Sequence, residues 1–285
     1  MRQAILITAY NDFDQLRRLV AYFDDGFEVF VHIDKRCRQI PDDVQRPNVH
    51  LYQRYRIPWG SVNHLRAIVF LMGEAAGHGD LEYFHLITGS DYPVPSLNDL
   101  KSFGEAHRHE NYLEYFPLPR PGWDGDGGLD RVNYYWPQRW LRPGENQAGY
   151  RMTAFLVKLQ RKLGLRRWFD FFDGRLYGGG TYWSVSREAV EYALGFLQAH
   201  PRYLRRFRNT KIAEEICLPT LWANSELPLT NHSLRYIEWG SEASPRVLDE
   251  QDFDRIVGSG CLFARKISST LSKGLVDKIK HYHGN

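Results

Sequence analysis

The sequence predicts an α/β fold: a mostly parallel, Rossmann-like central sheet flanked by helices. Short apolar runs alternate with amphipathic segments of helical length over the first hundred residues, which is typical of a doubly wound sheet. Polar residues follow several of these runs, where open parallel sheets bind their ligands. With 285 residues, 43% of them hydrophobic, the chain is long enough to bury one large core.

The elements of the first half follow from hydrophobic spacing. Strands are expected at 4–9, 27–33, 49–52 and 83–88. Helices are expected at 13–23, capped by Asp12, and at 61–76, beginning at Ser61. Three polar residues then stand at the carboxyl ends of strands: Asn11, Asp34 and Asp91.

The second half is less regular. Residues 117–144 are rich in Pro, Gly, Trp and Tyr without a clean period, which indicates a long, functional loop. A basic helix is expected at 147–165, a glycine turn at 178–180 leading into a strand, and helices at 187–199 and 213–222. The tail from Ser268 predicts a basic amphipathic helix. We expect one domain over 1–285, in which the second half completes a site begun by the first.

Composition excludes several classes of protein. A net charge of +3 is far from that of a dedicated nucleic-acid binder. Three widely spaced cysteines, Cys37, Cys217 and Cys261, predict no disulfide framework and favour a reducing compartment. No apolar stretch approaches the ~20 residues of a membrane span, and no signal peptide is visible. These features predict a cytoplasmic protein. An aromatic content of 14% is compatible with stacking on sugar rings.

Three groups of residues are candidates for chemistry, each with a structural alternative. Glu214 and Glu215 begin a predicted helix, as capping carboxylates or with one acting as a general base. Asp91 is either a ligand contact or a turn acid. Arg265 and Lys266, with Arg246 upstream, either hold a diphosphate or are solvated surface charges.

Two motifs bear on whether the chain binds phosphate or a metal ion. Gly178-Gly179-Gly180 lacks the spacing of a phosphate loop, and predicts close approach of the backbone to a ligand or a strand. Of three Asp-x-Asp pairs, only Asp124 with Asp126 lies where a divalent cation could be held, which leaves a metal-dependent sugar-phosphate hydrolase as one alternative. None of the three pairs follows the fourth predicted strand.

Taken in order, several short motifs resemble the core-2/I-branching β-1,6-N-acetylglucosaminyltransferase family, which includes protein xylosyltransferases. The matching segments are ILITAYN (5–11), VHIDK (31–35), WGS (59–61), LITGSDYP (86–93), LE (113–114), GGTYWSVSR (179–187), AEEI (213–216) and LFARK (262–266). The resemblance implies an A-type glycosyltransferase fold, a UDP-sugar donor, inversion at the anomeric carbon, and no metal or other cofactor. Residues 1–100 would then bind nucleotide, and 101–285 would supply acceptor and catalytic groups.

The resemblance also implies roles for individual residues. Glu215 would be the catalytic base, preceded by the acid Glu214, and Lys266 with Arg246 would replace the metal beside the leaving UDP. The remaining donor-side positions are Asn11, Asp34 and Asp91. The acceptor-side positions are Glu114, Arg131, Tyr182 and Trp239. The chain departs from the family pattern at Tyr10-Asn11-Asp12, where His-Lys is commoner.

The predicted function is therefore transfer of a sugar, N-acetylglucosamine being favoured, from its UDP derivative to a saccharide or lipid-linked oligosaccharide in a bacterial-type polysaccharide pathway. The alternatives are a xylosyltransferase and a non-catalytic carbohydrate-binding protein. The C-terminal helix, with Lys273, Lys278 and Lys280, either rests on the inner membrane face or is a solvated basic face.

Overall fold

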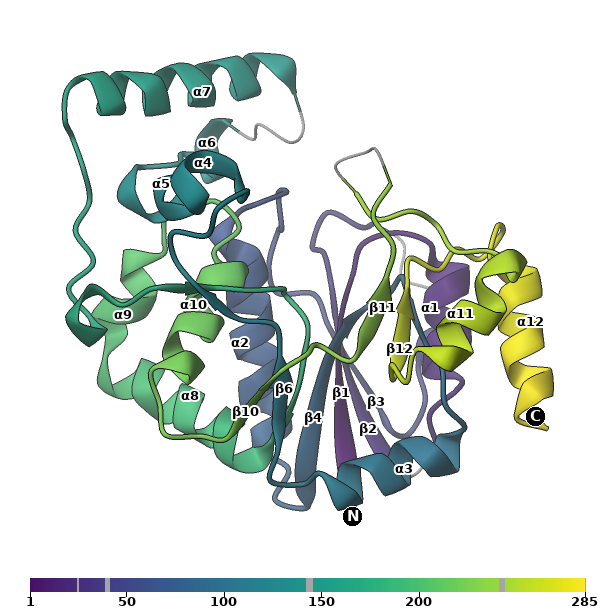
Figure 1. The fold of residues 1–285 in the computed structure, drawn as a ribbon. Coiled ribbons are helices and arrows are strands. Elements are labelled where there is room, and N and C mark those ends of the chain that lie inside the picture. Colours follow the sequence, from purple (N-terminus) through teal and green to yellow (C-terminus); the bar gives the residue numbers. More distant parts are fainter. Residues whose placement is uncertain (25, 39–41, 142–145, 241–243, 285) are drawn as a thin grey trace.

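The computed structural model describes residues 1–24, 26–38, 42–141, 146–240 and 244–284 (Figure 1). Its centre is a seven-stranded sheet of order β10-β6-β9-β4-β1-β2-β3. The strands are β1 Arg2–Ala9, β2 Phe27–Ile33, β3 Val49–Tyr52, β4 Leu81–Thr88, β6 Asn111–Leu113, β9 Trp183–Ser186 and β10 Leu229–Asn231. All neighbouring pairs are parallel except those of β9, which runs antiparallel to β4 and β6. The mostly parallel α/β sheet is confirmed.

Helices cover both faces of this sheet because its central strands are apolar on both sides. Ala4 and Leu6 of β1 face one core, and Ile5 and Ile7 face the other. The first core packs against α2 Val62–Ala76, α8 Arg187–Ala199, α9 Pro201–Arg206 and α10 Glu214–Ala223. The second packs against α1 Phe13–Val20 and α3 Leu97–Ala106. These two groups of helices lie on opposite sides of the strands in Figure 1.

A smaller sheet, of order β11-β12-β5, stands beside the carboxyl ends of the large one. It consists of β11 Arg235–Ile237, β12 Phe263–Arg265 and β5 Asp91–Pro93. Its core includes α11 Phe253–Gly258 and α12 Lys273–Tyr282. The C-terminal helix therefore begins at Lys273 rather than Ser268, and its apolar residues Leu275, Val276 and Ile279 are buried inside the chain.

The predicted loop 117–144 is wrong in part, because it contains short helices: α4 Asp124–Gly127, α5 Leu129–Asn133 and α6 Gln138–Leu141. Each is too short to leave a hydrophobic period in the sequence. At the edge of this segment β7 Phe116–Pro117 pairs with β8 Tyr177–Gly178. The next helix, α7 Gln147–Lys162, ends before the predicted residue 165 because Gly164 takes a left-handed conformation (φ 66°) that stops it. Within the described part of the chain, no helix is both long and apolar enough to cross a bilayer.

Candidate active site

Glu215 lies on the first turn of α10, and the preceding Glu214 is linked through His64 to Thr8 near the carboxyl end of β1. Its side chain is 26% exposed, and Arg131 Nη1 of α5 donates a hydrogen bond to its Oε2 at 2.7 Å. Burial raises the pKa of Glu215 from the ordinary 4.5 to about 7; Arg131 opposes the rise, whereas the charges of Glu214 and Glu114 add to it. A carboxylate with this pKa is well suited to accept a proton near neutral pH.

Glu214 has a different environment from its neighbour. It is 6% exposed, and its Oε1 lies 2.8 Å from His64 Nδ1 of α2. The other ring nitrogen, His64 Nε2, lies 3.1 Å from Thr8 Oγ1 at the end of β1. Glu214 therefore joins α10 to α2 and β1, while Glu215 keeps an accessible side. Glu214 is thus a structural carboxylate, but it acts through His64 and not as a side-chain cap of α10, at whose N-cap no side-chain hydrogen bond is present.

The glycines before β9 allow three segments to meet beside Glu215. Gly179 N donates to the Glu215 carbonyl at 2.9 Å. A Cβ atom on Gly179 would lie 1.9 Å from the Glu114 carbonyl oxygen, so no larger residue fits there. The close backbone approach predicted for this turn is confirmed, and its partner is the chain that follows β6. This contact brings Glu114 to the same side of the site as Glu215.

On the predicted acceptor side, Glu114, Arg131 and Glu215 are brought together. The Arg131 guanidinium lies over the Trp123 ring at 4.1 Å, which orients it toward Glu215. Glu114 is half-exposed, and Arg120 Nη1 lies 3.5 Å from its Oε1. Trp239, after β11, is 67% exposed and free to stack on a ring. No contact in the described residues joins Trp239 to Glu215.

The predicted donor residue Asp91 is fully buried and is paired with Arg265, which the sequence analysis noted but did not assign. Arg265 Nη1 lies 3.1 Å from Asp91 Oδ1 and also donates to the Thr88 hydroxyl. Its guanidinium carbon is 5.1 Å from the centre of the Tyr182 ring. Burial raises the pKa of the Tyr182 hydroxyl, and Arg265, Asp91 and Glu215 all act on it electrostatically. Tyr182 is thus in contact with Arg265 and near enough to the candidate base to interact with its charge. In the sequence, only the position of Arg265 next to Lys266 could have indicated that Arg265 belongs to this site.

Lys266 follows Arg265 directly and is half-buried. No ion pair or hydrogen bond of its ammonium with any described residue is recorded. Its backbone N–H donates to the Arg246 carbonyl at 3.4 Å, so the two predicted cations are neighbours. The Arg246 guanidinium, however, donates to Asp252 Oδ1 at 2.7 Å and to Glu238. Of the two side chains, Lys266 is therefore the one without an ion-pair partner among the described residues.

Asp34 stands at the end of β2 as predicted, but its carboxylate is already bound. Arg36 Nη2 donates to it at 2.7 Å and Ile57 N at 3.2 Å. Its pKa stays below the ordinary value because these donors outweigh the cost of burial. His32 supports the same loop, since its Nε2 accepts from Arg54 N and Tyr55 N, and burial lowers its pKa to about 4. Asn11, in contrast, is exposed.

Potential metal ligands do not gather at this edge in the described residues. Glu28, His50 and His78 are close enough to share an ion, but Glu28 lies at the start of β2, at the opposite end of the sheet from Asp34. Asp126 pairs with Arg161 at 3.5 Å, and the side chain of Asp124 lies outside the described residues. The predicted independence of metal stays a prediction.

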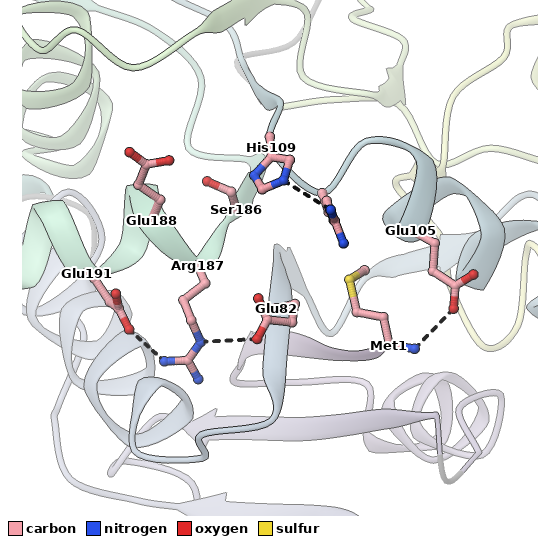
Figure 2. A pocket seen from close by; sticks show the side chains of 9 residues that line it. Met1, Glu82, Glu105, His109, Ser186, Arg187, Glu188 and Glu191 are labelled. Atoms are coloured by element: carbon pink, nitrogen blue, oxygen red, sulfur yellow. Dashed lines mark hydrogen bonds and ion pairs between the residues drawn. The ribbon is translucent and has the colours of Figure 1, made fainter.

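A pocket of about 680 Å³ also lies at the opposite end of the sheet (Figure 2). Its charged side chains largely pair with one another: Arg187 lies 2.7 Å from Glu191 and 4.0 Å from Glu82, and the Met1 amino group 3.1 Å from Glu105. Glu82 belongs to the start of β4, whereas Thr88 ends it near Arg265. This pocket is separate from the cluster around Glu215.

Comparison with known proteins supports the resemblance seen in the motifs. Residues 4–257 match the family described as Core-2/I-Branching enzyme. Xylosyltransferase 2 of Rattus norvegicus is 24% identical over 95% of this chain and 32% of its own length, and that of Homo sapiens is 25% identical over the same shares. Beta-glucuronosyltransferase GlcAT14B of Arabidopsis thaliana is 25% identical over 98% of this chain and 65% of its own length.

The chain thus spans about a third of the length of the xylosyltransferases it matches. Among solved structures, that of S. aureus TarS is 18% identical and covers 40% of this chain and 21% of its own, with a TM-score of 0.30, too low to support an argument. The family match begins within β1, passes through the Glu214–Glu215 pair and ends in α11. It therefore includes Glu114, Arg131 and Glu215 but stops before Arg265 and Lys266. The chain belongs to the Core-2/I-Branching enzyme family, with the A-type glycosyltransferase architecture expected of it.

Proposed function

We propose that the protein is an inverting, UDP-sugar-dependent glycosyltransferase with Glu215 as its catalytic base. The observation that carries the proposal is the environment of this carboxylate. It is partly buried, has a pKa of about 7, and is held by Arg131 beside an accessible edge of the sheet. The relatives named xylosyltransferase and glucuronosyltransferase support a nucleotide-sugar donor and a hydroxyl acceptor.

In the proposed reaction the acceptor oxygen forms a bond to C1 of the sugar on the face opposite the phosphate. The C1–O bond to UDP breaks, its electron pair leaves with UDP, and Glu215 takes the acceptor proton. The departing diphosphate gains negative charge, which a cation must stabilise. Lys266 is suited to this because its ammonium has no recorded partner in the described residues, and we assign no metal or other cofactor to the step.

Binding of the two substrates would divide along the cluster. The donor side comprises the strand-end residues Asn11, Asp34 and Asp91 with Lys266 and Arg246, and we add Arg265 because it fixes Asp91 and faces Tyr182. The acceptor side comprises Glu114, Arg131, Tyr182 and Trp239. The exposed Trp239 ring offers a stacking surface for a sugar.

The experiment is slow hydrolysis of a panel of UDP-sugars without acceptor, covering N-acetylglucosamine, xylose and glucuronic acid. We expect one sugar to be released by the wild type and not by Glu215→Gln, and EDTA to leave the rate unchanged. Stabilisation by UDP in a thermal melt separates this enzyme from a carbohydrate-binding protein without nucleotide affinity. Failure of every UDP-sugar together with no UDP stabilisation would refute the proposal.

A further inference from the structure

Helix α7 carries an apolar stripe on its outer face. Met152, Phe155 and Leu159 recur at helical spacing and are 48%, 59% and 38% exposed. Leu163 extends the stripe just beyond the helix end and is 59% exposed. Figure 1 places α7 at the outer edge of the molecule, beyond α4, α5 and α6. Large apolar side chains in a row on a surface mark an interaction site.

The opposite face of α7 is already packed against the protein. Gly149, Thr153 and Val157 are buried along it. A Cβ on Gly149 would lie 1.8 Å from the Leu141 carbonyl of α6, so the two helices touch closely. Gln160 exchanges hydrogen bonds with the backbone of Tyr135, at 2.8 and 3.0 Å. The helix is therefore held in one orientation, with its apolar stripe turned away from the core.

A row of cations runs beside the stripe. Arg151, Lys158 and Lys162 recur at the same helical spacing, one position away from Met152, Leu159 and Leu163. All three are exposed, and no ion pair with a described residue is recorded for any of them. Residues 147–168 contain no Asp or Glu. Apolar residues flanked by uncompensated cations are the pattern of a helix that lies in the interface of an anionic bilayer.

We propose that α7 docks the protein on an anionic lipid surface, with Met152, Phe155 and Leu159 entering the headgroup region and Arg151, Lys158 and Lys162 contacting lipid phosphates. The charge of α7 favours an anionic lipid surface over a second copy of the chain as the occupant. A second copy that docked through the same helix would bring the same cations against this one. The two most exposed tryptophans, Trp140 and Trp168, flank α7 in the chain and are 78% and 85% exposed. Tryptophan is favoured at membrane–water interfaces.

The proposed docking face adjoins the acceptor side of the candidate site. Arg161 of α7 lies 3.5 Å from Asp130 of α5, the residue beside Arg131. If the proposed function holds, this arrangement presents the acceptor side to lipid-linked saccharides. The docking itself rests only on α7 and does not depend on sugar transfer.

The test is flotation of the protein with vesicles of phosphatidylcholine alone and of phosphatidylcholine mixed with phosphatidylglycerol. We expect binding only to the anionic vesicles. Met152→Ser/Phe155→Ser/Leu159→Ser should weaken it ~10-fold or more, and Arg151→Glu/Lys158→Glu ~30-fold, because each cation near an anionic surface contributes to binding. The matched control is Lys273→Glu/Lys280→Glu on α12, whose apolar side is buried, and it should bind almost as the wild type does.

Circular dichroism, thermal melting and light scattering accompany each variant. Loss of binding by a variant with wild-type melting supports docking by α7. Wild type that stays unbound by anionic vesicles, or an equal loss in the α12 control, overturns the proposal. A wild-type dimer that the serine variant converts to a monomer also overturns it, because a second copy would then cover the stripe. UDP-sugar hydrolysis is a separate measurement, so its failure would refute the proposed function and leave the docking result standing.

Discussion

Arg131 Nη1 donates a 2.7 Å hydrogen bond to Glu215 Oε2, across 84 residues of sequence. Burial raises the pKa of Glu215 to about 7, while the guanidinium holds that pKa below the value that burial alone would give. The pair therefore sets the pH at which Glu215 becomes a base.

The first prediction concerns the pH dependence of transfer. A base must be deprotonated, so kcat/KM should rise with pH and level off above about 7. Arg131→Met should move this limb to higher pH, because the cation that lowers the Glu215 pKa is gone. Glu214→Gln should move it to lower pH, because the charge of Glu214 raises that pKa.

The control for these shifts is Arg120→Met, which removes a cation that contacts Glu114 and not Glu215. Its pH limb should stay close to that of the wild type. Equal shifts for Arg120→Met and Arg131→Met, or shifts of Arg131→Met and Glu214→Gln in the same direction, would contradict the assignment of Glu215 as the titrating base.

The second prediction separates the two neighbouring glutamates by rate. Glu215→Gln should lower kcat by ~10²–10⁴ while UDP affinity stays near the wild-type value. Glu214→Gln should retain much more activity at its own optimal pH, because Gln can still accept a hydrogen bond from His64. Steady-state rates and UDP titration measure both. Full activity in Glu215→Gln would remove it from the role of base.

The sequence predicted the fold well where hydrophobic spacing was strong. Strands β2 and β3 and helix α8 have the expected bounds, and Asp34 follows β2 directly as foreseen, whereas Asp91 begins the unforeseen strand β5 shortly after β4 ends. Short elements such as β11, β12 and α4 leave no periodic pattern, so they were not visible. β12 matters most, because its pairing with β5 places Arg265 opposite Asp91.

Side-chain partners were harder to foresee than positions. Arg246 was assigned to the diphosphate from motif order, but its guanidinium is bound by Glu238 and the buried Asp252. Asp34 is likewise bound by Arg36. Both assignments stay predictions. Such pairings depend on which loops fold against each other, and one sequence carries no signal for that.

The third prediction is a cost in stability at the candidate base. The folded pKa of Glu215, about 7, lies above its ordinary value of 4.5, so the folded state holds a proton that the unfolded state releases between these values. Stability should therefore fall as pH rises from 4.5 to about 7. Glu215→Gln should be more stable than the wild type at pH ~8, by up to ~3 kcal/mol, and little changed at pH ~4.

Urea unfolding at the two pH values measures this difference. Glu188→Gln is a suitable control, because Glu188 is exposed on α8 and no pairing is recorded for it within the described chain. A Glu215→Gln variant with equal gains at both pH values would show that the gain does not come from the buried charge.

The fourth prediction concerns the two cations beside the donor side. Lys266→Ala should weaken UDP binding ~10–100-fold and lower turnover, because it removes an ammonium that has no partner among the described residues and with it a charge-assisted contact with phosphate. Lys273→Ala, which replaces an exposed lysine at the start of α12, should leave both UDP binding and turnover unchanged.

Arg246→Ala should above all lower the melting temperature, because it leaves the buried Asp252 with Arg255 as its remaining cationic partner. UDP titration at a temperature where each variant is folded separates the effects. If Arg246→Ala weakens UDP binding as much as Lys266→Ala does, the guanidinium must leave Glu238 and Asp252 when nucleotide arrives, and the two cations act as a pair. If Lys266→Ala binds UDP as tightly as the wild type, the leaving-group role passes to another group.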